Sequence, residues 1–181
     1  MQAEELIRMI HEQAHPMLEG LFGELRTNLG TSHYHRLSNE EFFWRGNAVL
    51  LRLTEWLTSR NVAAVHHSSE ELGRERFTEG IPLGQVVLAL ILVEKQIWEY
   101  ARQAGKHPDE SLRLIVAEFF ARLIYSAALG YEEVLAESQR KSRGTIVPPN
   151  ATGGKTKTAN SSEENQEIST SRSGQVGEFG G

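Results

Sequence analysis

The sequence predicts an all-α fold, in which a bundle of five helices is followed by a disordered C-terminal tail. Three observations support this fold class. Apolar residues recur at helical spacing, helix start and stop signals separate the periodic segments, and no segment alternates apolar and polar residues as a half-buried strand does. The domain is expected to cover residues 1–141, and the tail residues 142–181. A globin-like arrangement of the helices is an alternative for a domain of this size.

Capping residues, prolines and glycines mark the ends of the predicted helices. Ser38 can form a capping box with Glu41, and Ser68 can form another with Glu71, so each pair predicts a helix start. Residues 30–37 are expected to form a loop. The expected boundaries are Gln2 to Asn28, a start at Ser38, Ser68 to Gly80, Pro82 to Ala104, and a start at Pro108.

Two of the predicted helices have unusual sequences. The first contains Pro16, which must kink it, because proline removes a helical hydrogen bond and clashes with the preceding turn. The fourth contains the apolar run from Val86 to Val93 and is apolar on all sides at its centre. A helix of that kind is expected to be the central buried element of the bundle.

The segment from residue 142 onward consists mainly of Gly, Ser, Thr, Asn, Glu and Lys, with Phe179 as its only aromatic residue. It can bury too little apolar surface to offset the entropy cost of ordering, so we expect it to be disordered. Its acidic and basic residues balance, and the predicted domain therefore carries the whole net charge of −5. A net acidic domain without a basic stripe is a poor nucleic-acid binder.

The composition also argues against several classes of protein. The chain has no cysteine, which excludes disulfides and thiolate zinc sites. The apolar run from Val86 to Val93 is far shorter than the roughly 20 residues that span a bilayer. The N-terminal segment lacks the basic start and apolar centre of a signal peptide. We therefore expect a cytoplasmic protein that does not enter a membrane.

Residues 11–15 read His-Glu-Gln-Ala-His and match the zinc-peptidase pattern H-E-x-x-H. In that chemistry His11 and His15 would bind zinc one helical turn apart, and Glu12 would polarise a bound water. Pro16 disfavours helical geometry at His15, so no metal is expected here. A zinc-dependent hydrolase using these three residues remains one alternative function.

The same segment resembles the phosphoacceptor box of histidine kinases, because Pro16 lies five positions after His11 and Glu12 follows the histidine. The intervening residues differ from those usual in that box. A stand-alone histidine phosphotransfer protein using His11 is therefore a second alternative.

The remaining histidines give weak evidence for a metal or cofactor, since no third ligand is known to lie near any pair of them. A haem ligand among His66, His67 and His107 is left open, although no cofactor is expected. The sequence contains neither a phosphate-binding glycine loop nor a nucleophile elbow in a suitable context. We therefore expect a protein that is not an enzyme.

The segment from Leu72 to Tyr100 is the most distinctive part of the sequence, and its recognisable parts are Gly73-Arg74-x-Arg76, Gly80-x-Pro82-Leu83, an apolar run, and Ile97-Trp98. It resembles the N-terminal regulatory module of the RsbR/RsbRD-type co-antagonist proteins of bacterial stress signalling, over about residues 15–138. The resemblance implies a helical sensor that passes a signal through its last helix to an attached output domain. Here the predicted tail takes that domain's place, so the module is expected to act in trans on a signalling partner, a kinase or a STAS-type protein.

Three residues of this segment are candidates for binding a ligand or a partner. Arg74 and Arg76 could bind an anion or a partner's carboxylate, or could instead form ion pairs within the domain. Trp98 is the third candidate, with packing in the core as its alternative.

The last helix is expected to join two copies of the chain. One apolar stripe along it can face the bundle, but Ile115, Phe120 and Leu129 point well away from the centre of that stripe. One helix face cannot bury both sets, and an exposed apolar patch marks an interaction site. The sequence therefore predicts a homodimer, unless the kinked first helix covers the second set.

Overall fold

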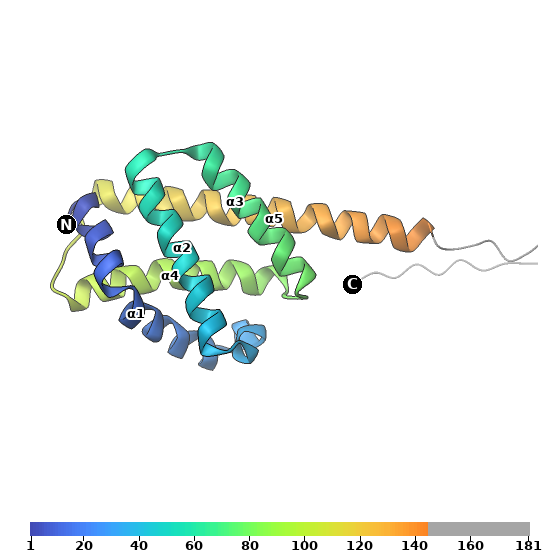
Figure 1. Ribbon diagram of the computed structural model, residues 1–181, viewed down its shortest axis with the longest axis horizontal. Helices are drawn as coiled ribbons and strands as arrows, with labels where there is room; N and C mark the ends of the chain where they lie inside the picture. The colour runs from blue at the N-terminus through green and yellow to red at the C-terminus, as the bar shows by residue number, and fades with distance from the viewer. Residues whose placement is uncertain (145–181) are drawn as a thin grey trace, which may run out of the picture. The chain divides into compact units, whose positions relative to one another are not determined.

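The computed structural model describes residues 1–144, which form five α-helices and one 3₁₀ helix and contain no strand (Figure 1). The all-α prediction is confirmed, and a 3₁₀ helix takes the place of the expected loop at residues 30–37. The predicted tail falls outside the described residues, except that α5 continues through its first three positions. The helices are α1 (Ala3–Thr27), η1 (Leu29–Arg36), α2 (Asn39–Ser59), α3 (Val62–Thr78), α4 (Leu83–Gln103) and α5 (Glu110–Gly144).

The kink predicted in α1 is present. Gln13 leaves helical geometry, with φ −129° and ψ 17°, three residues before Pro16. This is the turn that Pro16 disturbs, because a proline cannot donate the hydrogen bond that would reach back four residues. Both halves of α1 still bury apolar side chains in the core, including Ile10 before the kink and Leu18 after it.

The capping box at the start of α2 is also confirmed. The Ser38 hydroxyl accepts a hydrogen bond from the backbone N–H of Glu41 (3.2 Å), and the Glu41 carboxylate accepts one from the backbone N–H of Ser38 (3.0 Å). The helix ends at Ser59 and is followed by Arg60, which has the left-handed backbone conformation (φ 54°). Two free N–H groups at the start of α2 are thereby satisfied by one serine–glutamate pair.

The predicted start of α3 at Ser68 is wrong. The helix begins at Val62, where the Asn61 side chain caps it by accepting a hydrogen bond from the N–H of Ala64 (3.1 Å). Ser68 lies inside the helix and donates its hydroxyl proton to the Val65 carbonyl (3.3 Å). Serine has this second option because its hydroxyl can bond to the preceding turn of a helix as well as cap a new one.

The helices α4 and α5 follow the predicted order with small shifts at their starts. Gly80 and Gly105, which end α3 and α4, have φ values of 73° and 69°, which glycine adopts without strain. Pro82 precedes the first residue of α4, and α5 begins two residues after Pro108. The N-terminus is held beside the α4–α5 turn, where the ammonium group of Met1 donates to the His107 carbonyl (2.7 Å).

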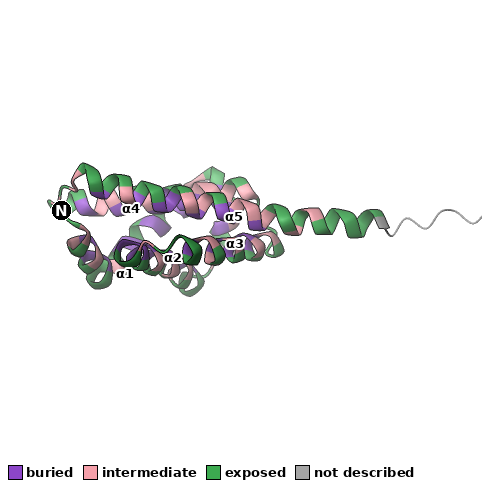
Figure 2. Cartoon of the chain, turned by 90° about the horizontal axis from the view of Figure 1, so that it is seen from above, coloured by how far each residue is buried: buried purple, intermediate pink, exposed green. Residues whose placement is uncertain are grey.

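Burial on α4 differs from the prediction. One side of the helix faces the core, with Val86 and Ile97 almost fully buried, but Ile91 is 47% exposed. The helix α4 is therefore buried on one side only and is not enclosed on all sides by the rest of the bundle. Figure 2 shows that buried residues line the inward sides of several helices, and that α5 continues past them with a mostly exposed surface.

The helices α3 and α5 pack against each other more extensively than any other pair. A Cβ atom on Gly73 would overlap the backbone of Ala127, and one on Gly130 would overlap the backbone of Glu70. The two backbones are therefore in direct contact, and only glycine fits at these two positions.

This packing corrects the expectation for the second apolar set on the last helix. Phe120 is only 1% exposed, and Ile115 and Leu129 are partly buried. The bundle buries more than one stripe of α5, because helices pack around it on more than one side. These three residues therefore do not argue for a dimer. No helix within the described residues is long and apolar enough to cross a membrane.

Candidate functional site

The candidate site is a small cavity of about 50 Å³ between η1 and the helices α1 to α4. Most of its walls are apolar, and the polar side chains among them are Tyr34, Arg45 and Arg76. A water molecule needs about 10–15 Å³ measured in this way, so the cavity has room for roughly three to five atoms of that size. The apolar walls include Leu21 and Leu25 of α1, Phe42 and Val49 of α2, Leu72 of α3, and Val86, Leu90 and Val93 of α4.

Two arginines meet on one carboxylate beside this cavity. Arg45 donates from Nη1 to Oε2 of Glu79 (2.7 Å), and Arg76 donates from Nη1 to both carboxylate oxygens (3.0 Å each). The Arg76 side chain is only 7% exposed, whereas that of Glu79 is 34% exposed. Charge-assisted hydrogen bonds of this kind hold a guanidinium in a fixed direction, so both arginines are oriented for a carboxylate.

The Tyr34 hydroxyl belongs to the same cluster. Tyr34 is 8% exposed, and no group among the described residues forms a hydrogen bond with its hydroxyl. Burial raises the pKa of Tyr34, although the nearby charges of Arg76 and Arg45 lower it in part. The phenol is therefore neutral at physiological pH and can donate a hydrogen bond to a bound group.

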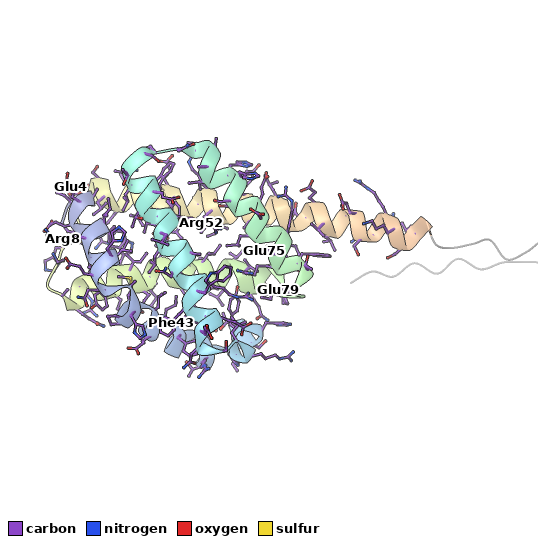
Figure 3. All side chains as sticks on the ribbon, viewed as in Figure 1. Glu4, Arg8, Phe43, Arg52, Glu75 and Glu79 are labelled. Atoms are coloured by element: carbon purple, nitrogen blue, oxygen red, sulfur yellow. The ribbon has the colours of Figure 1, made fainter. Side chains whose placement is uncertain are left out.

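Further charged groups continue along the facing sides of α2 and α3. In Figure 3, Arg52 lies on α2, with Glu75 on α3 and Glu79 just after its end. Burial lowers the pKa of Arg52, while the charge of Glu75 raises it and that of Arg76 lowers it further. Arg52 lines a separate surface depression with Trp56 and is not part of the cavity wall.

The structure separates the three candidates taken from the sequence. Arg74 forms ion pairs with Glu70 (3.3 Å) and with Glu133 of α5 (2.8 Å), so it joins two helices on the surface. Arg76 alone lines the cavity. The three candidates do not form one site.

Trp98 lies on a shallow groove at the α4–α5 turn, where the guanidinium of Arg113 is 5.5 Å from the centre of its ring. It is partly buried and does not line the cavity. Burial raises the pKa of Glu94, and the Trp98 indole lowers it in part. Trp98 thus belongs to a different surface from Arg76.

The histidines of the zinc-peptidase pattern contact different parts of α2. His15 stacks on Phe43 near the start of α2, with ring centres 4.4 Å apart, and lies 3.7 Å from Glu19. His11 is exposed and lines a surface depression with Thr54 and Thr58 near the other end of α2. Among the described residues, no group of three or more acidic or histidine side chains is arranged to hold a metal ion.

A haem does not fit the cavity. None of the three histidines left open as haem ligands lines it, and a tetrapyrrole is far larger than its volume of about 50 Å³. His66 instead pairs with Glu70 on α3 (3.1 Å), His67 is exposed, and His107 lies at the α4–α5 turn.

Sequence reasoning missed most of this site. Tyr34, Arg45 and Glu79 come from three separate segments, and only Arg76 was singled out as a binding residue. One feature of the sequence could have pointed to Arg45. It lies on the same side of its helix as Phe42 and Val49, which are both buried. A charged residue beside a buried apolar stripe is unusual, and it indicates a partner or a ligand.

A comparison of the chain with protein-family models, with curated proteins and with solved structures found no match in any of the three.

Proposed function

We propose that this chain is a non-catalytic signalling module of the bacterial cytoplasm, which receives a signal in its helical core and passes it on through α5. The observation that carries the proposal is an apolar stripe along α5 that is exposed at several of its positions. Leu114, Ala121, Ala128 and Leu135 follow one another at intervals of seven residues. Ala117, Ile124 and Tyr131 lie three positions after the first three of them, which completes a heptad pattern.

The stripe is accessible along much of its length. Leu114 is 65% exposed and Leu135 is 37% exposed, while Ala117 and Ala121 are also exposed. The remaining three members are partly buried, and Tyr131 packs against Phe77 of α3, with ring centres 5.2 Å apart. From Leu114 to Leu135 the stripe extends about 30 Å, at the usual rise of 1.5 Å per helical residue. It begins on the bundle and continues onto the part of α5 that extends past the other helices (Figures 1 and 2).

A second copy of the chain is the partner that best fits this stripe. A heptad pattern pairs helices along a seam, and two identical seams can pair about a twofold axis. The alanines allow close approach of the two helix backbones, because their side chains are short. Pairing of α5 with its twin would also give the module a way to transmit motion to a kinase or a STAS-type protein.

Light scattering coupled to size-exclusion chromatography tests the proposal on the full chain. We expect a dimer at micromolar concentration, and Ala121→Glu or Leu114→Glu should convert it to a monomer whose helix content, measured by circular dichroism, is unchanged. Leu29→Glu is the matched control, since Leu29 is 91% exposed on η1 and away from the stripe. A wild-type monomer, or variants that remain dimeric, would exclude this role of α5.

The exposure of His11 supports a second candidate, a histidine phosphotransfer protein. Its imidazole is accessible on α1, as a phosphoacceptor must be. Phosphoramidate, a small phosphodonor, should then label wild-type protein and His15→Ala but leave His11→Ala unlabelled. Equal labelling of all three proteins, or none, would contradict this second function.

A further inference from the structure

We propose that the cavity binds a short-chain aliphatic monocarboxylate, whose carboxylate takes the place of Glu79 between Arg45 and Arg76. The inference rests on the proposed sensor function for its biological meaning and names the class of ligand sensed. The binding itself can be tested separately from the role of α5.

The first step of the argument is that a carboxylate already occupies the position between the two arginines. Glu79 accepts hydrogen bonds from Arg45 at 2.7 Å and from Arg76 at 3.0 Å on both oxygens. This contact demonstrates that the two guanidinium groups converge closely enough to bind one carboxylate together. A ligand carboxylate in the same place would receive the same charge-assisted hydrogen bonds.

The second step is that Glu79 can leave. It follows the last residue of α3, immediately before Gly80, and its side chain is 34% exposed, so its carboxylate can be solvated outside the cluster. Arg76 cannot follow it easily, because its side chain is 7% exposed. Departure of Glu79 would leave Arg76 with the more distant Glu75 carboxylate (3.6 Å) as its remaining acidic partner, so an anion bound between the two arginines would be favoured.

The third step is that Tyr34 offers an additional donor. Its hydroxyl has no hydrogen-bond partner among the described residues, and it lines the cavity together with both arginines. The hydroxyl is therefore free to donate a hydrogen bond to a ligand oxygen in the cavity. Three donors on one side of an apolar cavity match a group with one anionic head.

The fourth step is the size and character of the rest of the cavity. Apart from these three polar residues its walls are apolar, and its volume of about 50 Å³ accommodates roughly three to five atoms the size of water. Apolar walls favour an aliphatic chain over a sugar or an amino acid, whose polar groups would find no partners. With the carboxylate in the place of Glu79, which is not part of the cavity wall, the cavity has to hold only the three to five remaining carbons of a monocarboxylate of about four to six carbons. The chain of a long-chain fatty acid does not fit this volume.

Ligand binding in the cavity would also affect the position of α5. Glu79 ends α3 with a backbone hydrogen bond to the Glu75 carbonyl (2.9 Å), and α3 contacts the backbone of α5 at Gly73 and Gly130. Releasing the Glu79 side chain therefore changes the restraint on the helix that packs most extensively against α5. This gives the ligand a physical route to the exposed stripe of α5.

Isothermal titration of the full chain with valerate tests the proposal, with 1-pentanol and decanoate as comparison ligands. We expect valerate to bind, pentanol to bind about tenfold more weakly or worse because it lacks the charged group, and decanoate to bind more weakly than valerate. Equal binding of pentanol would overturn the role of the arginines. Tighter binding of decanoate would overturn the proposed size limit.

Three variants place the ligand in the cavity. Arg45→Gln should weaken valerate binding by about tenfold or more, whereas Glu79→Gln should strengthen it several-fold because a competing carboxylate is removed. Arg52→Gln is the matched control, since Arg52 lies on the same helix as Arg45 but outside the cavity wall, and its affinity should be unchanged. Circular dichroism confirms that each variant is folded.

No binding by the wild type or by Glu79→Gln at about 10 mM valerate would overturn the inference, and so would weaker binding by Glu79→Gln. The oligomeric state is measured on the same samples. A dimer that does not bind valerate contradicts only the proposed ligand. A monomer that binds valerate contradicts only the proposed role of α5.

Discussion

The two sides of α3 are built in opposite ways. On one side its backbone contacts that of α5 at Gly73 and Gly130, with no space for a single added carbon. On the other side it meets α2 and α4 across a small cavity and a group of charged residues, where Arg45 and Arg76 share the Glu79 carboxylate. The α5 side of α3, the rigid side, is expected to hold α3 in one position. On the cavity side, the adjustable side, Arg45 and Arg76 can exchange the Glu79 carboxylate for another anion. A ligand that binds in the cavity would thus act on the adjustable side of α3. The resulting movement of α3 would be transmitted to α5 through the rigid side.

The largest effect is expected on the rigid side. Gly73→Ala should lower the free energy of unfolding by about 2–3 kcal/mol, because the new methyl group would overlap the Ala127 backbone and force the helices apart. The thermal midpoint should fall by about 10 °C in a domain of this size. Gly23→Ala is the control, since nothing lies within 4 Å of its added carbon, and it should gain about 0.5–1 kcal/mol. Equal effects of the two substitutions would remove the contrast between the sides of α3.

A smaller effect is expected at the start of α2, which borders the cavity side. Ser38→Ala should cost about 1 kcal/mol, because the N–H of Glu41 loses its capping acceptor. Thermal or urea unfolding monitored by circular dichroism measures the loss. A cost near zero would mean that tertiary packing alone fixes the entry to α2.

The same cap predicts a dependence on pH. Hydrogen bonds from the Ser38 backbone and hydroxyl hold the pKa of Glu41 below its usual value. A carboxylate with a lowered pKa in the folded state stabilises the protein above the unfolded pKa of about 4.3, and this contribution is lost as the pH falls through the folded pKa. Glu41→Gln should therefore be less stable than wild type at pH 7, with a difference that shrinks toward pH 3. A difference that stays constant across that range would contradict the role of the Glu41 charge.

Little effect is expected on the adjustable side away from the cavity. Arg52→Met should change the stability by no more than about 0.5 kcal/mol. The substitution removes attraction to Glu75, but it also removes repulsion from Arg76 and the cost of partial burial. A loss of about 2 kcal/mol in urea unfolding would show that the charges between α2 and α3 fix the packing there.

The smallest effect is expected at the end of α5. Ending the chain after Arg140 should leave the thermal midpoint within about 2 °C, which corresponds to less than about 1 kcal/mol. The reason is that residues 137–143 of α5 are exposed and contribute nothing to the core. A fall of about 10 °C in differential scanning calorimetry would instead show that this end of the chain is part of the stable fold.

The sequence by itself determined the features that depend on a few neighbouring residues. The kink before Pro16, the capping box of Ser38 and the helix ends at Gly80 and Gly105 follow from local hydrogen bonding and backbone conformation, and all were predicted. The all-α class follows from apolar spacing, which is equally local. Ser68 shows where such local reasoning fails. Ser68 and Glu71 have the spacing of a capping box, but α3 already starts at Val62, where Asn61 caps it and Val65 is buried in the core.

Only the tertiary structure decided which surfaces are covered and which groups meet. Phe120 is buried because neighbouring helices enclose α5, and the spacing within α5 contains no information about their positions. The candidate site depends on the same kind of information, since η1 supplies Tyr34, α2 supplies Arg45, and Glu79 follows α3. Contacts between residues distant in the chain arise from helix packing. A single sequence shows which face of each helix is apolar, but it does not show which other helix packs against that face.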